Sequence, residues 1–316
     1  LVNYYLRLQR GLSETTIHAL QDCQLLLGLN IDFLSNSIQT IDPTNTLQSS
    51  KAEDTQTLLS AILTNQQTCL DGLQSTSSAS SIKNTLLTPL SNGTKLYSVS
   101  LAIFRHGWVD DTKKGRWLTE RKHIFSDIDS AGRNGHLPLR MSRQDRKVLE
   151  SVSGRKLLLQ ATGDDVKVIQ TVVVNPDGSG NFTTINDAVA AAPNKTKAGK
   201  GYFLIYVVAG VYEEYVSIDK NKKYLMIMGD GINQTVITGN RSVVDGWTTF
   251  NSATFAVVGQ GFVAVNITFR NTAGAIKHQA VAVRNGADLS AFISCSFEGY
   301  QDTLYTHSLR QFYREC

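Results

Sequence analysis

Apolar residues recur at helical spacing through the first third of the chain. Ile17, Leu20 and Cys23 follow Ser13 at this spacing, and serine is a favoured residue at helix N-termini. The same pattern returns over 51–73, and a further helix opens at 81–90. Short, turn-rich connectors separate these segments. The pattern predicts an all-α up-and-down bundle over residues 1–103.

From residue 168 the period of the pattern changes from 3.6 to 2. A single helical segment, 185–192, interrupts the strands and is expected to cap the N-terminal end of their core. The run 263–269 resembles 290–297 at an offset of 28 residues, which favours a solenoid over a sandwich. The predicted strands are 172–174, 203–208, 224–228, 235–238, 255–258, 262–269, 281–283 and 292–297.

Residues 104–160 form an irregular, basic linker between these two halves. One short helix is expected after Ser142, with Asp145 completing a capping arrangement. The dibasic pair Arg155-Lys156 is an accessible position for proteolysis, and the alternative is a solvated charged linker. The expected domains are therefore 1–103, the linker 104–160, and a β-domain over 161–316.

Charge and composition narrow the function classes. A net charge of +4 over 316 residues is too small to indicate nucleic-acid binding, but it is compatible with an anionic polymer as partner. No run of 18 apolar residues exists, so no membrane span is expected. The first residues carry neither an initiator Met nor a signal peptide, which suggests a piece of a longer precursor. Glycosylation sequons at Asn92, Asn181, Asn194, Asn233, Asn240 and Asn266 favour the secretory pathway.

The four cysteines show no metal-like spacing. Cys23 and Cys69 lie on separate helical segments, and we predict a disulfide between them rather than two buried thiols. Cys295 is expected to be a buried thiol. Cys316 is expected to pair with a cysteine beyond the end of this sequence.

Two segments near the end of the chain carry candidate chemistry. If one coil of the solenoid takes about 22 residues, Gln279 and Gln301 lie one above the other, with Asp302 beside them. Two amide donors can hold the oxyanion that forms on an ester carbonyl, and a carboxyl group can protonate the leaving alkoxide. The alternative is a polar ladder with Asp302 as a turn residue.

Three motifs, Gly210-Val211-Tyr212-Glu213-Glu214, Gln279-Ala280-Val281-Ala282 and Gly299-Tyr300-Gln301-Asp302-Thr303-Leu304, resemble plant pectin methylesterases in order and separation. The helical half is similar to the pectin methylesterase inhibitor family, found as the pro-region of these enzymes. Arg155-Lys156-Leu157-Leu158 resembles the cleavage motif between the two parts.

The resemblance implies a right-handed parallel β-helix and an aspartyl esterase that hydrolyses methyl esters of homogalacturonan and releases methanol. It implies that Asp302 is the general acid/base, that Gln279 and Gln301 stabilise the oxyanion, and that Thr249 and Gln279 contact substrate. The family's nucleophile, a second aspartate in an Asp-Phe-Ile-Phe-Gly motif, is expected beyond Cys316. The 316-residue chain alone is therefore expected to be inactive.

The resemblance also implies a secreted protein of the cell wall, without cofactor or metal. The expected partners are methyl-esterified pectin, a processing protease and the protein's own pro-region. Two alternatives stay open. One is an inhibitor or chaperone that acts through the helical half, and the other is a β-helix polysaccharide lyase. A lyase generally needs clustered carboxylates for Ca²⁺, whereas the acidic residues of this β-region are scattered.

Overall fold

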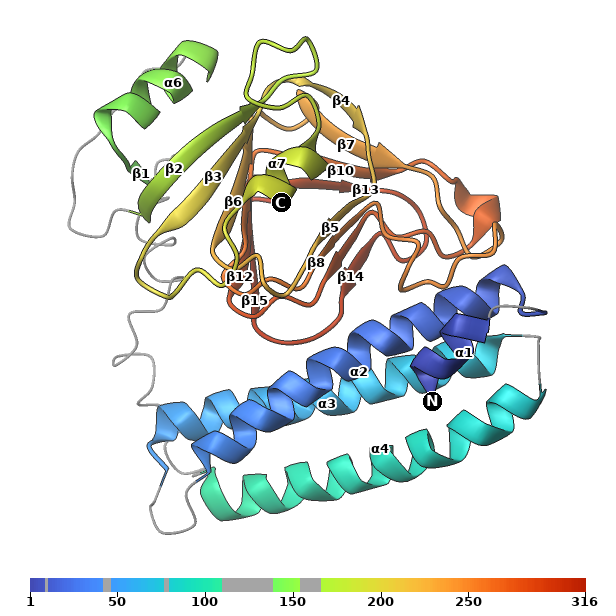
Figure 1. Cartoon of the computed structure of the whole chain (residues 1–316). Helices are drawn as coiled ribbons and strands as arrows, with labels where there is room; N and C mark the ends of the chain where they lie inside the picture. The colour runs from blue at the N-terminus through green and yellow to red at the C-terminus, as the bar shows by residue number, and fades with distance from the viewer. Residues whose placement is uncertain (9–10, 42–46, 77–79, 110–138, 154–165) are drawn as a thin grey trace. The chain divides into compact units, whose positions relative to one another are not determined.

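The computed structural model describes residues 1–8, 11–41, 47–76, 80–109, 139–153 and 166–316 (Figure 1). Arg155 and Lys156 lie outside the described residues, as does much of the predicted linker 104–160.

Contacts divide the chain into two units. The first contains the described part of Leu1–Trp117 together with Ser242–Asn251 and His307–Leu309. The second contains the described part of Leu118–Arg241 together with Ser252–Thr306 and Arg310–Cys316.

Helices make up most of the first unit: α1 (Val2–Leu8), α2 (Glu14–Thr40), α3 (Ser49–Ser75) and α4 (Ser80–Trp108). Helix α2 packs against α3, and α3 packs against α4, so the predicted up-and-down bundle is confirmed (Figure 1). The helices are longer than predicted. Helix α4 continues through Pro89 to Trp108, where the sequence pattern indicated only its opening.

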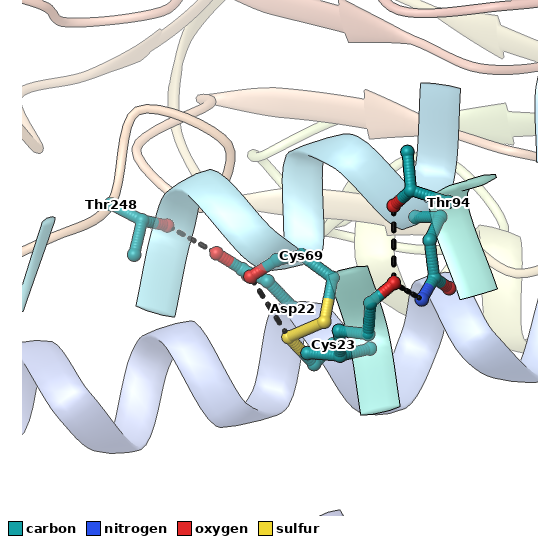
Figure 2. Close-up of a disulfide and its surroundings, with 7 residues drawn as sticks. Asp22, Cys23, Cys69, Thr94 and Thr248 are labelled. Carbon is teal, nitrogen blue, oxygen red and sulfur yellow. Dashed lines mark hydrogen bonds between the residues drawn. A yellow bond between two sulfur atoms is a disulfide. The ribbon is translucent and has the colours of Figure 1, made fainter. Parts of the chain in front are cut away.

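A hydrogen-bonded cap and a disulfide fix helix α2. The Ser13 hydroxyl accepts a hydrogen bond from the Thr16 backbone N–H at 3.3 Å, as the pattern predicted. Cys23 of α2 is bonded to Cys69 of α3, with their Cα atoms 4.7 Å apart (Figure 2). The predicted disulfide is confirmed, and it ties the first half of α2 to α3.

The bundle core contains polar side chains among its leucines and isoleucines. Asn65 of α3 donates a hydrogen bond to the Asn30 side-chain oxygen at 2.8 Å, and Asn30 donates to the Ile62 carbonyl at 3.2 Å. Both asparagines are buried. A buried amide without a partner is destabilising, so this pair fixes how α2 and α3 align.

The second unit is a parallel β-helix, as predicted (Figure 1). Every strand pair among the described residues of this unit is parallel. The first sheet has the order β1 (Leu139–Arg140), β2 (Val166–Val174), β3 (Tyr202–Val207), β6 (Leu225–Gly229), β9 (Val263–Val265), β12 (Ser290–Ile293), β15 (Gln311–Arg314). The second has the order β13 (Ser296–Glu298), β10 (Thr268–Asn271), β7 (Thr235–Gly239), β4 (Gly210–Glu213), and the third β14 (Leu304–Thr306), β11 (Val283–Asn285), β8 (Phe255–Val257), β5 (Val216–Ile218).

Two runs predicted as single strands are each two strands joined by a corner. Asn266 separates β9 from β10, and Ser294 separates β12 from β13. Both residues take a left-handed backbone conformation, with φ of 58° and 50°. Asn is enriched in this conformation, and Ser294 adopts it at the equivalent corner of the next coil. The 28-residue offset itself is confirmed, since Ala291 pairs with Val263.

Helix α7 (Ile185–Ala191) packs against β2 and β3 of the first sheet and against β5, the first strand of the third sheet, as the predicted end cap requires (Figure 1). The Glu214 carboxylate accepts hydrogen bonds from the N–H groups of Ile185 at 2.9 Å and Asn186 at 3.0 Å. A carboxylate at a helix N-terminus is favourable because the first N–H groups have no partner within the helix. The predicted helix after Ser142 is α6 (Arg143–Ser153), and the Ser142 hydroxyl accepts from the Asp145 N–H at 3.0 Å.

Aromatic rings from successive coils fill the inside of the β-helix. Phe292 contacts Phe262, Phe269, Phe297 and Tyr313, with ring centroids 5.2–6.0 Å apart. Phe292 is fully buried. Each of these rings lies on a different strand or corner, so the core depends on every coil keeping its register.

Candidate active site

Gln279 and Gln301 lie in neighbouring coils and form a parallel β-bridge. The Ala280 N–H donates to the Gln301 carbonyl at 3.1 Å, and the Ala282 N–H donates to the Thr303 carbonyl at 2.9 Å. The predicted stacking of the two glutamines is therefore confirmed. It follows from the coil length, because residues one coil apart are direct neighbours across a parallel ladder.

Asp302 lies where the register between the two coils changes. Gln279 opposes Gln301, but Val283 opposes Leu304. The segment 279–283 therefore has one residue more than the segment 301–304. Asp302 takes the left-handed conformation with φ of 62°. Such irregularities re-aim a side chain and are frequent beside active sites.

A tight turn holds the backbone on the other side of Gln301. The Thr303 hydroxyl donates to the Tyr300 carbonyl at 3.0 Å. A Cβ atom at Gly299 would lie 2.9 Å from the Thr303 hydroxyl oxygen, so a larger residue would push this threonine aside. The turn thus positions Gln301 and Asp302 through backbone geometry.

Buried polar residues anchor the strand that follows Gln279. The Val281 N–H donates to the Ser252 hydroxyl at 3.1 Å, and the Val281 carbonyl accepts from Asn271 Nδ2 at 3.1 Å. Ser252 and Asn271 are both buried. The sequence pattern did not indicate a role for these two residues. The available signal was an asparagine at a strand end directly before the turn-forming run Thr272-Ala273-Gly274.

The candidate residues differ in exposure. Ala280 and Val281 are buried, Gln279 is half-buried, and Gln301 and Asp302 are exposed. Tyr300 is 65% exposed, so an aromatic ring next in sequence to the Gln301 amide and the Asp302 carboxyl group is available for stacking. The candidate site therefore combines a buried backbone at Ala280 and Val281 with exposed polar side chains that a large molecule can reach.

Thr249, the remaining predicted substrate contact, belongs to the first unit through the segment Ser242–Asn251. In that unit its neighbour Thr248 donates a hydrogen bond to the Asp22 carboxylate (Figure 2). Trp247 stacks on His18, with ring centroids 4.1 Å apart. The role of Thr249 stays a prediction.

Among the described residues, cavities of about 320 and 380 Å³ lie in the helical unit. The larger one is lined by apolar side chains that include Leu27, Ile31 and Leu86. Neither lining includes an aspartate or glutamate. Within the described ranges, no group of three or more His, Cys, Asp or Glu side chains could hold a metal ion.

None of the helices in the described part of the chain combines the length and the hydropathy that crossing a bilayer requires.

Comparison with known proteins separates the two halves of the chain. The family model "Pectinesterase" matches residues 171–316, which include Gln279, Gln301 and Asp302. The model "Plant invertase/pectin methylesterase inhibitor" matches residues 2–103. The β-helical half belongs to the pectinesterase family, and the helical half belongs to the inhibitor family.

Curated relatives carry both regions in one chain. "Probable pectinesterase/pectinesterase inhibitor 20" of Arabidopsis thaliana is 59% identical over 304 residues, covering 96% of this chain and 53% of the relative. "Probable pectinesterase/pectinesterase inhibitor 7" of the same plant is 55% identical over 336 residues, covering 100% of this chain and 58% of the relative. The chain thus spans a little over half the length of these relatives.

Among solved structures, "Pectin methylesterase from Carrot" is 56% identical in sequence. The similarity covers 45% of this chain and 44% of that chain, with a TM-score of 0.44.

Proposed function

We propose that the protein hydrolyses the methyl esters of pectin, giving pectate and methanol. The observation that carries the proposal is the parallel bridge between Gln279 and Gln301, with Asp302 next in sequence at a register change. These residues lie in the region that matches the pectinesterase model. Paired amides beside a carboxyl group suit an ester carbonyl better than they suit the proton abstraction that a polysaccharide lyase performs.

The proposed roles follow from the chemistry of each group. The Gln279 and Gln301 amides donate hydrogen bonds to the carbonyl oxygen as it gains negative charge. A neutral amide acts as a fixed dipole, whereas a lysine would pair with the free carboxylates of the polymer. Asp302 gives its proton to the leaving methoxide, which departs as methanol, and then takes a proton from the water that completes hydrolysis. The resemblance implies that a second carboxylate attacks the ester carbonyl carbon.

The test uses the purified full-length protein. Asp302→Asn keeps the shape of the side chain but removes its acid–base function, so methanol release from highly esterified pectin should fall about 10²–10⁴-fold. Glu213→Gln removes an exposed carboxylate on β4 and serves as the matched control, with activity near wild type expected. An Asp302→Asn variant with wild-type activity would show that another group is the acid/base.

We also propose that the helical half acts as an inhibitor-type pro-region on the β-helical half. The match of residues 2–103 to an inhibitor family motivates this second function. Full-length protein should release methanol faster after proteolysis within the linker than before it. Equal rates, with both halves still present by mass spectrometry, would leave the helical half with a folding role and no inhibition.

Processing is proposed at the dibasic pair Arg155-Lys156, between the two matched regions. Protein isolated from tissue should begin a few residues after Lys156 on N-terminal sequencing. A mature N-terminus before Arg140 would contradict the proposal.

Secretion to the cell wall is proposed from the nature of the substrate. The Cys23–Cys69 disulfide supports an oxidising compartment, because such bonds rarely persist in the cytosol. The six sequons predict glycosylation on this route. A fluorescent fusion of the full-length protein should label the wall after plasmolysis, and label confined to the cytoplasm would refute the proposal.

A further inference from the structure

Lysine side chains of the β-helical unit are concentrated in three short segments. Among residues 166–316, every lysine except Lys277 lies at the start of β2, in the loop 192–201 between α7 and β3, or in the loop 219–224 between β5 and β6. These lysines are Lys167, Lys195, Lys197, Lys200, Lys220, Lys222 and Lys223. We call this set the lysine surface.

Hydrogen bonds hold the two loops of the lysine surface side by side. The Lys195 backbone N–H donates to the Asn221 carbonyl at 2.6 Å. The Lys222 ammonium group donates to the carbonyls of Ala190 at 2.8 Å and Ala192 at 2.5 Å, where helix α7 ends. Lys222 therefore fixes the second loop against the first, and its charge also stabilises the C-terminus of α7.

Strand β2 brings Lys167 to the same place. A Cβ atom at Gly201 would lie 2.7 Å from the Lys167 carbonyl oxygen, so the end of the first loop lies against β2. Just before Gly201, the Lys200 N–H donates to the Lys197 carbonyl at 3.2 Å and closes a turn. Lys167, Lys195, Lys197 and Lys200 are all exposed. The surface thus presents several ammonium groups to solvent from adjoining segments.

The three segments contain one acidic residue, Asp219. Its carboxylate accepts hydrogen bonds from the Asn221 backbone N–H at 2.8 Å and from the Asn221 side-chain amide at 2.6 Å. Along the chain, no Asp or Glu occurs between Asp187 and Glu213. The lysine surface therefore carries a net positive charge, and grouped charges of one sign attract a polymer of the opposite sign.

The lysine surface is separate from the candidate active site. The order of the third sheet places β8 between β5 and β11. The loop 219–224 follows β5, whereas Gln279 precedes β11 and Gln301 precedes β14. Because the strands of this sheet are parallel, the loop and the two glutamines lie at opposite ends of the strands.

We propose that the lysine surface binds galacturonan that has lost its methyl esters, the polyanionic product of the proposed reaction. The choice of this polymer rests on the proposed function, whereas the binding itself requires no turnover. Each hydrolysed ester leaves one carboxylate, so the polymer becomes more strongly attracted to the lysines as the reaction proceeds. Charges spread over three surface segments suit an extended chain with repeated carboxylates better than a small anion.

Such binding would keep the protein on polymer that it has already demethylated. The candidate active site acts on esters, which are uncharged, while the lysine surface holds the charged stretches nearby. Contacts between exposed ammonium groups and carboxylates are screened by salt, so this attachment should weaken as ionic strength rises.

The test measures the Kd of the full-length protein for polygalacturonic acid at low salt. N-glycans are first removed enzymatically, because Asn194 begins a sequon next to Lys195. The triple variant Lys195→Gln, Lys197→Gln, Lys200→Gln should raise Kd about 10-fold, since an exposed ion pair contributes a factor of about two. The difference from wild type should shrink at high salt.

Two further variants separate this surface from charge in general. Arg7→Gln with Lys51→Gln and Lys95→Gln removes the same net charge from exposed residues of the helical unit and should bind as wild type does. Arginine at positions 195, 197 and 200 keeps the charges and should also retain wild-type binding.

Three results would overturn the proposal. They are wild-type affinity in the glutamine triple variant, an equal loss in the helical-unit variant, and an equal loss of affinity for highly esterified pectin. Methanol release from a short, fully methyl-esterified oligogalacturonide should keep its wild-type kcat and KM in the glutamine triple variant. A wild-type protein that releases no methanol would contradict the proposed esterase function, while the Kd values would still decide whether the lysine surface binds the polyanion.

Discussion

The helical unit and the β-helix both build dry cores, but they obtain each contact from a different range of the sequence. In the helical unit, residues three or four positions apart share a face, and the helices are then joined by a few long-range links such as Cys23–Cys69 and Asn30–Asn65. In the β-helix, the partner of almost every core residue lies one coil away. The comparison teaches that a substitution should act locally in the bundle and should disturb neighbouring coils in the β-helix.

The largest effect is expected in the aromatic core of the β-helix. Phe292→Ala removes a fully buried ring that contacts four others, so the β-helix should lose about 4 kcal/mol of its free energy of unfolding. Denaturant unfolding followed at a strand-specific signal measures this loss, while the helical signal should keep its midpoint. Val211→Ala is the control, because Val211 is 62% exposed. A shift of both signals together would mean that the two units unfold as one.

The second prediction concerns a double substitution in the helical unit. Cys23→Ala with Cys69→Ala opens a loop of 46 residues, so the bundle should lose about 3 kcal/mol. Circular dichroism at the helical minimum during urea unfolding reports the change. Helical stability equal to that of wild type would show that packing alone holds α2 against α3.

Alkaline pH should weaken the β-helix through Tyr313. Burial raises the pKa of this phenol from 10.0 to about 12. Between these values the unfolded chain has lost the proton that the folded chain keeps, so deprotonation favours unfolding. The contribution of Tyr313 is fully present below pH 10 and is lost as pH rises through 12, at on the order of 1 kcal/mol per pH unit. Tyr313→Phe should flatten the slope of stability against pH in this window, and an unchanged slope would contradict the assignment.

The smallest effect is expected at the cap of the β-helix. Glu214→Gln keeps a hydrogen-bond acceptor but removes the charge at the N-terminus of α7, so stability should fall by about 0.5–1 kcal/mol. The loss should shrink at high salt because charge interactions with a helix terminus are screened. Glu213→Gln, at the preceding residue, which is exposed, controls for the change in net charge. A salt-independent loss would point to altered packing instead.

The same contrast explains what the sequence could predict. Helical periodicity located the helices, but it understated their length. The pattern of α2 weakens after Leu26, although Leu29 and Asn30 are still buried. Period-two runs located the strands but not the corners at Asn266 and Ser294, since a left-handed residue leaves no trace in hydrophobicity. Strands β14 and β15 were not predicted, because they are short and only half-buried.

The candidate site also has features that the sequence could predict and features that it could not. The stacking of Gln279 on Gln301 could be predicted because it depends on coil length alone. The anchoring of Val281 by Ser252 and Asn271 could not, since it needs three segments at different distances along the chain.

The central claim is that register brings Gln279 and Gln301 together as paired oxyanion donors. The most direct measurement is kcat for methanol release by full-length Gln279→Ala, Gln301→Ala and the double variant, with circular dichroism to verify the fold. Each single substitution should lower kcat about 10²–10³-fold with little change in KM, because the donors act on the charge that develops in the transition state. Single variants that keep the wild-type kcat would contradict the account.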